Sequence, residues 1–245
     1  MKRYFLLLLA VCEFSFGMYA QSIAPKVKFV RYNESSKTTE DVEVEESKSE
    51  TGDAPLEITC IANVNDGGGK YNYMCEWKIY RSDKGEESTF LVRTDEEFTY
   101  TLTESGGYGI KLYVSFVDEK GDSVELQTEQ PISVVVSESK LICPDGVSPN
   151  DDNLNDKLII EYKSLVKASG VIVNRWGKKL HTFTLENLKD GWDAKQNGKP
   201  VKDGAYFLYL DAVGSDGLHY KIRKTISVLS GFNQTADDNG ATANE

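Results

Sequence analysis

Oxygen-bearing side chains are concentrated in one short segment, Ser148 to Asp156, where they could bind a cation. Asn150, Asp152 and Asp156 bring amide and carboxylate oxygens to one loop, and hard cations such as Ca²⁺ prefer such ligands. The EF-hand pattern also needs a glycine at the bend and a distal glutamate, and neither is clear here. Asn and Asp side chains hydrogen-bond their own backbone and shape loops without metal. A calcium site is therefore one interpretation, and a metal-free turn is the favoured one.

Catalytic chemistry has little support elsewhere in the chain. His181 and His219 lie in strand or turn segments, with no serine or cysteine nucleophile in a recognisable setting. The sequence contains no glycine-rich phosphate cradle and no His/Cys metal cluster. We therefore expect a protein that is not an enzyme and that needs no cofactor.

The cysteines could form one disulfide bond. Cys60 shares the inward phase of Ile58, and Cys75 shares the inward phase of Trp77, so both thiols are expected to point into the same core. A Cys60–Cys75 bridge is one outcome, and two buried reduced thiols that act as small hydrophobes are the other. Cys143 would then be unpaired.

The first residues have the character of a processing segment. Lys2 and Arg3 precede a short apolar run from Phe5 to Val11, so residues 1–20 are expected to be a signal peptide. That run is too short to span a bilayer, and no later stretch approaches the length of a membrane span. The net charge of −11 argues against nucleic acid as a partner, because phosphates require a basic surface.

The pattern of residues 21–140 predicts strands separated by turns. Residues 34–50 carry seven acidic side chains against two lysines and are expected to form a solvated loop. A first strand is predicted at 26–32, and seven more are predicted at 56–64, 71–81, 89–93, 97–102, 108–118, 123–127 and 132–136. Regular short strands with Gly/Asp turns predict an antiparallel immunoglobulin-type sandwich with Trp77 in its core. The segments 53–58, 73–79 and 107–117 resemble a PKD-like module, which implies an interaction or adhesion role.

Residues 141–230 also read as an all-β unit, after a short polar joint at 137–140. Strands are predicted at 158–162, 170–175, 179–184, 205–212 and 218–229. Asp216-Gly217 is expected to close a hairpin between the last two, because glycine tolerates the positive φ that such turns require. The fold class is therefore all-β, with two antiparallel sandwiches. Residues 231–245 are small, polar and acidic and are expected to be disordered.

Five local signatures follow one another in this second unit. They are Ser148–Asp156, Asn174-Arg175-Trp176-Gly177, Gly191-Trp192-Asp193, Asn197-Gly198-Lys199 and Asp203-Gly204-Ala205-Tyr206-Phe207. Their order and spacing resemble the gliding-motility-associated C-terminal domain, the type B sorting domain of the bacterial type IX secretion system. Asp151 and Asn153 replace two glycines of the family's loop, and Asn and Asp tolerate left-handed backbone best among the other residues.

The resemblance implies partners at the outer membrane: the type IX translocon and a small β-barrel protein. The residues that we expect to be read by this machinery are Arg175, Trp176, Trp192, Asp193, Lys221, Arg223 and Lys224. An alternative assigns Trp176 and Trp192 to plugging the ends of the sandwich. A second alternative assigns the cations of the last strand to protecting a sheet edge from aggregation.

Three functions remain open at this point. The first is an exported, non-enzymatic surface protein whose PKD-like module contacts a surface ligand or other envelope proteins. The second is an accessory or regulatory component of the type IX secretion or gliding machinery, because little precedes the sorting domain except one small module. The third is a glycan-binding module that uses Tyr71, Tyr73, Tyr80 or Tyr100 as stacking platforms, although Tyr71 and Tyr73 share the inward phase of Trp77.

Overall fold

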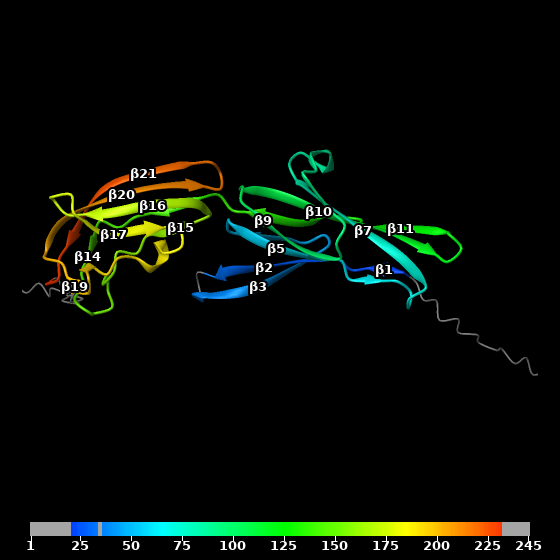
Figure 1. Cartoon of the computed structure of the whole chain (residues 1–245), viewed down its shortest axis with the longest axis horizontal. Coiled ribbons are helices and arrows are strands. Elements are labelled where there is room, and N and C mark those ends of the chain that lie inside the picture. Colours follow the sequence, from blue (N-terminus) through cyan, green and yellow to red (C-terminus); the bar gives the residue numbers. More distant parts are fainter. Residues whose placement is uncertain (1–20, 34–35, 232–245) are drawn as a thin grey trace, which may run out of the picture.

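The computed structural model describes residues 21–33 and 36–231, so the expected signal peptide and most of the expected tail lie outside the described residues. The described chain is β throughout, apart from two short 3-10 turns. Its buried hydrophobic residues form two clusters, one drawn from residues 27–136 and the other from residues 147–228. Two β units lie end to end (Figure 1). Within the described residues, no helix has the length and apolarity that crossing a membrane requires.

The first unit contains twelve strands and one 3-10 turn, η1 (Glu86–Ser88). The strands are β1 (Ser22–Ile23), β2 (Lys26–Asn33), β3 (Thr38–Glu45), β4 (Ser49–Gly52), β5 (Leu56–Ile61), β6 (Val64–Asn65), β7 (Tyr71–Arg81), β8 (Leu91–Arg93), β9 (Glu97–Leu102), β10 (Gly106–Asp118), β11 (Ser123–Gln127) and β12 (Ile132–Val136).

Two sheets enclose the first core. One has the order β3-β2-β5-β9 and the other has the order β4-β12-β10-β7-β8, with β11 added to β10. Alternating apolar residues face inward on the strands, and Trp77 of β7 is completely buried. Its indole Nε1–H donates to the carbonyl of Asp95 at 3.1 Å, so the polar end of the ring is satisfied. The predicted core position of Trp77 is confirmed.

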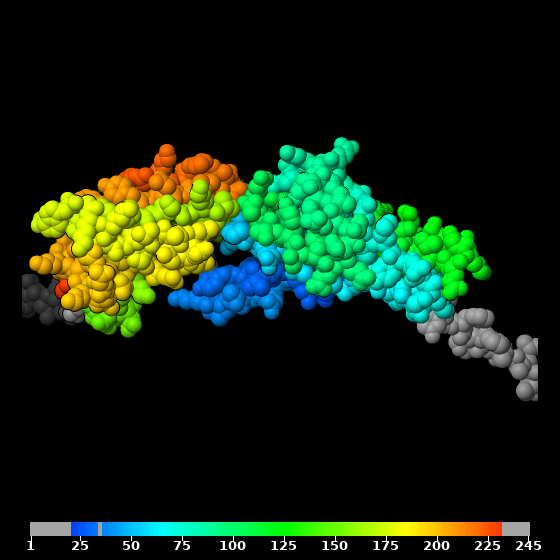
Figure 2. Space-filling model, in the orientation of Figure 1, coloured from blue at the N-terminus to red at the C-terminus, as the bar shows by residue number. Residues whose placement is uncertain are grey.

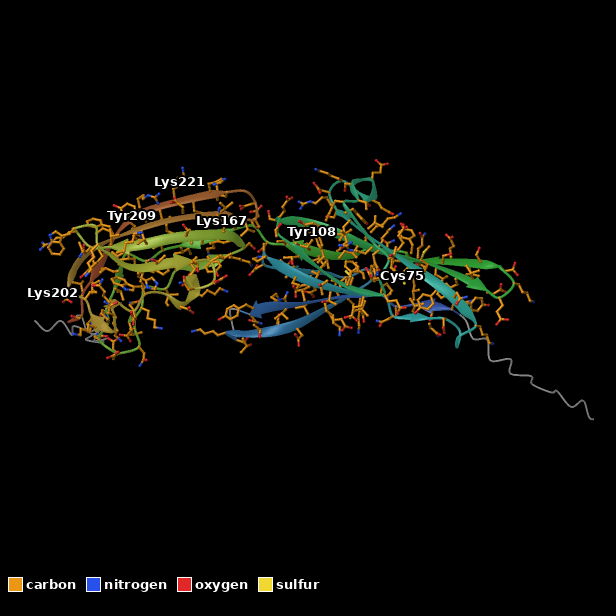
Figure 3. All side chains as sticks on the ribbon, viewed as in Figure 1. Cys75, Tyr108, Lys167, Lys202, Tyr209 and Lys221 are labelled. Atoms are coloured by element: carbon orange, nitrogen blue, oxygen red, sulfur yellow. The ribbon has the colours of Figure 1, made fainter. Side chains whose placement is uncertain are left out.

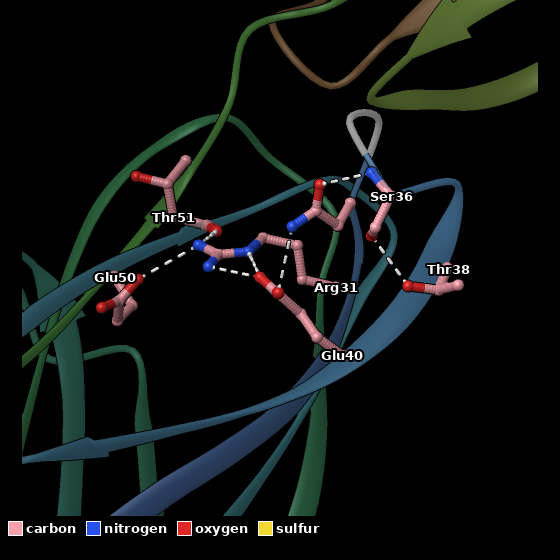
Figure 4. A network of polar contacts seen from close by, with 7 residues as sticks. Arg31, Ser36, Thr38, Glu40, Glu50 and Thr51 are labelled. Carbon is pink, nitrogen blue, oxygen red and sulfur yellow. Dashed lines mark hydrogen bonds and ion pairs between the residues drawn. The ribbon is translucent and has the colours of Figure 1, made fainter.

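The acidic segment 34–50 is not a loop, contrary to the sequence-based expectation. Most of it forms β3 and the start of β4. Val42 and Val44 of β3 point into the core, and the exposed carboxylates of Asp41, Glu43 and Glu45 alternate with them, which is the period of a half-buried strand. The cations of β2 compensate the acidic face, and one of them is Arg31. Its guanidinium binds Glu40 of β3 at 2.6 Å and Glu50 of β4 at 3.1 Å (Figure 4).

Cys60 and Cys75 come from opposite sheets of the first sandwich and are both buried. Both are free in the structure, so the bridge expected as one outcome is not formed, and the alternative of two buried thiols describes them. Burial raises the pKa of the Cys60 thiol to about 12, which leaves it protonated at neutral pH.

The second unit contains nine strands and one 3-10 turn, η2 (Leu188–Asp190). The strands are β13 (Lys140–Ile142), β14 (Gly146–Val147), β15 (Glu161–Lys163), β16 (Leu165–Val173), β17 (Lys179–Thr184), β18 (Lys195–Gln196), β19 (Lys199–Pro200), β20 (Gly204–Gly214) and β21 (His219–Val228). The main sheet has the order β14-β21-β20-β16-β17. The pairs β4–β12 and β14–β21 are parallel, a departure from the purely antiparallel expectation.

A polar junction joins the two units directly. Ser164 is only 2% exposed, and its Oγ accepts a hydrogen bond from the backbone N–H of Ala54 at 3.1 Å. Ser137 lies between the units, with its Oγ 2.6 Å from Ser164 Oγ and 2.6 Å from a carboxylate oxygen of Asp53. Lys163 of the second unit forms an ion pair with the same carboxylate. Figure 2 shows the two bodies in contact at this end, so the opposite end of the second unit, called its free end below, faces away from the first unit.

Candidate functional site: a groove at the free end of the second sandwich

The order of the strands explains why three of the five signatures meet. Strand β16 begins at the junction and ends at Val173, so the turn that follows it lies at the free end of the sandwich. Strand β20 runs antiparallel to β16, with Phe207 opposite Val173, so the residues that precede β20 lie at the same end. The β18–β19 hairpin, which contains Asn197, lies beside these two segments and contributes the third signature.

A groove of about 610 Å³ opens between these segments. Its lining comes from 174–176, Leu180, 196–197 and 199–206, and thus from three of the sequence signatures. Figure 3 labels Lys202 at this end of the molecule, away from the first sandwich. The groove is the candidate functional site of the second unit.

Asn174 shapes the turn that presents the first signature. Its side-chain Oδ1 accepts hydrogen bonds from the backbone N–H groups of Trp176 and Lys178, both at 3.0 Å. Gly177 closes the turn at a φ of 79°, a backbone region that glycine enters without strain. This geometry turns Trp176 outward, and its side chain is 74% exposed. The guanidinium of Arg175 stacks on the indole, with Cζ 4.1 Å from the ring centroid.

Trp192 has the opposite environment. It is 1% exposed, and its indole Nε1–H donates to the carbonyl of Lys195 at 3.2 Å. Its ring packs edge-on against Tyr206, with centroids 5.6 Å apart, and its backbone pairs with Leu158. The prediction that Trp192 contacts a partner is therefore wrong, because the core covers it. The alternative that made both tryptophans core plugs holds for Trp192 and fails for Trp176.

Asp193 stabilises the turn between Trp192 and Lys195. Its Oδ1 accepts the backbone N–H of Lys195 at 3.1 Å, and its Oδ2 lies 3.9 Å from the Lys195 ammonium. Asp193 is half-buried and does not line the groove. The structure therefore assigns it a turn-forming role beside the groove rather than a place in it.

Three cations and one carboxylate line the groove, which gives it a net positive charge. Arg175, Lys199 and Lys202 are exposed, and none of them forms an ion pair within the part of the chain that the structure describes. Asp203 is the acidic residue of the lining, and it accepts hydrogen bonds from the Oγ and backbone N–H of Ser230 at 2.6 and 3.1 Å. These bonds lower the pKa of the Asp203 carboxyl.

Sequence reasoning missed Lys199 and Lys202 as functional candidates. Asn197-Gly198-Lys199 and Asp203-Gly204 have the composition of tight turns, and Asn197, Gly198 and Gly204 all have positive φ. A lysine beside a tight turn is exposed, and only the three-dimensional structure shows that Lys199 and Lys202 form no ion pair within the described residues.

The oxygen-rich loop is a hydrogen-bonded turn. Both carboxylate oxygens of Asp156 accept backbone N–H groups, from Asn150 and Asp151 on one oxygen and from Asn153 on the other, at 2.8 to 3.0 Å. Asp152 accepts the N–H of Leu154 and the side-chain amide of Asn150. Asp151 and Asn153 adopt positive φ, as their replacement of glycine predicts.

The loop oxygens that the calcium interpretation requires are thus directed at N–H donors. Within residues 21–33 and 36–231, no cluster of three His, Cys, Asp or Glu side chains could hold a metal ion. The residues Asn150, Asp152 and Asp156 therefore fit the loop-shaping role better than the calcium site.

Two of the three β21 cations that were expected to be read by the export machinery form ion pairs within the second unit. Arg223 donates from Nη2 to both carboxylate oxygens of Asp211 at 3.0 Å. Lys224 forms an ion pair with Asp145. Lys221 lies opposite Asp211 on β20 and is exposed. Because β14 pairs only with Ser227 and Val228, the remaining edge of β21 has no further strand beside it in the described chain.

The tyrosines proposed as glycan platforms take part in packing. Tyr71 and Tyr73 lie against Phe116, at 6.5 and 5.9 Å between ring centroids. Tyr80 is buried, and Tyr100 is half-buried against Phe90 at 6.2 Å. None of these four rings forms an open stacking surface.

The fold defines an all-β protein made of two sandwiches in tandem, the second ending in a basic groove. Residues 141–226 match the family model described as the CHU_C Type IX secretion signal domain, and the C-terminal unit of this chain therefore belongs to the type IX sorting domains. This sorting signal implies export and a destination at the cell surface or outer membrane.

No curated protein matches the sequence. Among solved structures, the chain is similar to dimeric latent PorU from Porphyromonas gingivalis, with 13% identity, a TM-score of 0.25, and coverage of 84% of this chain and 24% of that one. It thus spans about a quarter of the PorU chain. It is also similar to the fibronectin(III)-like modules of Clostridium thermocellum CbhA, with 12% identity, a TM-score of 0.21, and coverage of 74% and 88%.

A third similarity is to the FN1–FN3 domains of chicken CNTN1, with 12% identity, a TM-score of 0.23, and coverage of 81% and 77%. At these scores, none of the three structures says what this chain binds.

Proposed function

We propose that this chain is a non-enzymatic surface protein in which the first sandwich is the functional module. The second sandwich carries the sorting signal for export, which is called the export address below. The observation that carries the proposal is the convergence of three separate signatures of a type IX sorting domain on one groove at the free end of the molecule. A purely structural role for these signatures would not explain why an exposed tryptophan and unpaired cations lie in the same groove.

The arrangement of the two units supports this division of roles. The polar junction at Ser137 and Ser164 occupies the end of the second sandwich that faces the first. The groove lies at the other end, so an exporter could contact it without passing the first sandwich. The partners in this proposal are the type IX translocon and an outer-membrane β-barrel protein. Residues 1–20 would act as the signal peptide that brings the chain to the periplasm.

For the first sandwich we infer a binding role rather than a catalytic one. Its outer surfaces carry acidic side chains that pair with lysines and arginines, as Glu43 does with Lys26 and Lys28. We propose that it acts as an adhesion or interaction module of the PKD-like kind. Its ligand is either a surface molecule or another envelope protein.

Deletion of residues 141–245 tests the export address. We expect the truncated chain to accumulate in the periplasm, where protease added to intact cells does not reach it, and the full chain to be digested at the surface. Circular dichroism of the purified truncation controls for misfolding of the first sandwich. Normal surface display of the folded truncation would refute the proposal.

A further inference from the structure

Three basic residues of the second unit that form no ion pair within the described residues line one groove, whereas other cations of the unit are paired. Arg223 binds Asp211, Lys224 binds Asp145, and Lys195 lies near Asp193. Arg175, Lys199 and Lys202 have no such carboxylate in the described part of the chain, although they line one groove. These three cations outnumber Asp203, the acidic residue of the lining, so the groove keeps a net positive charge that favours an anionic partner.

The wall of the groove adds an apolar contact. Trp176 exposes most of its indole, and Arg175 covers one face of the ring. Exposed tryptophan and arginine are the residue types most often found at the energetic centre of protein interfaces. Tyr206 also lines the groove. Its hydroxyl donates to the carbonyl of Lys202 at 2.6 Å, and its ring packs against the buried Trp192. The buried signatures therefore hold the exposed ones in position.

We propose that this groove binds an acidic, extended segment of a protein partner in the export machinery. The inference rests on the proposed function, because it names the chemistry of the partner that reads the sorting domain. The three cations come from the turn after β16, from β19 and from the segment before β20, and each is exposed, so they match carboxylates spaced along a peptide. A single phosphate would instead call for donors gathered around one point.

A binding measurement on the purified full chain tests this chemistry. The probe is a fluorescein-labelled peptide of alternating glutamate and leucine, compared with a peptide of alternating glutamine and leucine by fluorescence anisotropy at low ionic strength. We expect only the glutamate peptide to bind. The variant Arg175→Gln/Lys199→Gln/Lys202→Gln should weaken its binding about tenfold or more.

A matched variant controls for net charge. Lys140→Gln/Lys157→Gln/Lys167→Gln removes the same charge from exposed positions outside the groove and should change the affinity by less than about twofold. Quenching of tryptophan fluorescence provides a second readout, because Trp176 is exposed while Trp77 and Trp192 are buried. Trp176→Ala should abolish the quenching.

Three outcomes would overturn the inference. The first is failure of the glutamate peptide to bind the full chain, and the second is equal weakening by both triple variants. The third is binding only after truncation at Gly231, which would assign the groove to residues 232–245 of the chain itself, where Asp237 and Asp238 lie.

Surface display separates this inference from the function on which it rests. If deletion of residues 141–245 blocks display while the groove variant is displayed normally, the groove is not the recognition site and the export address stands. If the deletion has no effect on display, the export address itself is wrong. Reduced display of the groove variant, with normal display of the control variant, supports both.

Discussion

The guanidinium carbon of Arg175 lies 4.1 Å from the centroid of the Trp176 ring, and both side chains are outside the core. Trp192 belongs to another signature of the same domain, yet it is buried against Tyr206. The sorting domain therefore uses one tryptophan for its surface and the other for its stability, and the two roles can be separated by experiment.

Alanine substitution should distinguish the two tryptophans. We expect Trp192→Ala to lower the free energy of unfolding by about 3–5 kcal/mol, because it leaves a large cavity in the second core. Trp176→Ala should change it by about 0.5 kcal/mol or less, because the side chain is mostly in water. Urea denaturation of the two variants measures both values. Similar losses for the two would contradict the assigned burial.

Two glycines of the second unit should respond differently to alanine. Gly191 has a φ of 70°, and a Cβ there would lie 2.7 Å from the carbonyl oxygen of Leu158. Gly198 has a φ of 74°, and nothing lies within 4 Å of the position of its Cβ. Gly198→Ala should cost about 1 kcal/mol for the left-handed backbone alone.

Gly191→Ala adds a clash with backbone and should cost about 1 kcal/mol more than the Gly198 control. Thermal or urea unfolding gives the difference. Equal destabilisation would mean that the chain at Leu158 can move aside, and that the signature glycine serves backbone conformation alone.

Glu86 should make stability depend on pH. The hydroxyl of Tyr113 donates to its carboxylate, and Lys111 and Lys78 lie 3.2 and 3.7 Å away. The hydrogen bond from Tyr113 and the charge of Lys111 lower the pKa of Glu86. A lowered folded-state pKa contributes stability at neutral pH that is lost as the pH falls below about 4.

The Glu86→Gln variant isolates this contribution. We expect a loss of about 1 kcal/mol or less at pH 7, because the side chain is 33% exposed and the ion pairs are screened. The difference from the parent protein should shrink as the pH falls through the lowered pKa. Glu87→Gln, at an exposed neighbouring position, should show no such dependence. A difference that grows toward low pH has the wrong sign and would contradict the network.

The thiols offer a chemical test of the first core. We expect Cys60 and Cys75 to resist iodoacetamide in the native protein, because burial raises the pKa of both. In denaturant without reductant, all three described cysteines should become labelled, since the structure has them free. Mass spectrometry counts the labels. Labelling of Cys143 alone would show that Cys60 and Cys75 are joined by a disulfide bond.

Much of the fold follows from alternation that is legible in the sequence. The strands 71–81, 97–102, 123–127, 132–136 and 179–184 were predicted with the bounds that the structure has. All of them except 123–127 contain β-branched or aromatic residues at alternate positions between turn signals. The segment 38–45 was missed because its acidic charge obscured the alternation of Val42 and Val44, and its partner cations lie on β2.

The site was harder to predict than the fold. Trp176 and Trp192 both sit beside a glycine and a charged residue, and nothing local separates an exposed indole from a buried one. The pairing of Trp192 with Leu158 and its contact with Tyr206 decide the difference, and both are long-range. The pairing of Arg223 with Asp211 is similarly set by the register of β20 and β21. Residue types identified the signatures, and only the fold showed which of them are exposed.

Transfer of the domain to a foreign protein tests the central claim most directly. Residues 141–245 would be fused behind a soluble passenger with a signal peptide, in a cell with an active type IX system. The account predicts that protease added to intact cells digests this passenger, and that the same passenger without the domain stays protected in the periplasm. Equal protection of both passengers would contradict the claim that the second sandwich is the export address.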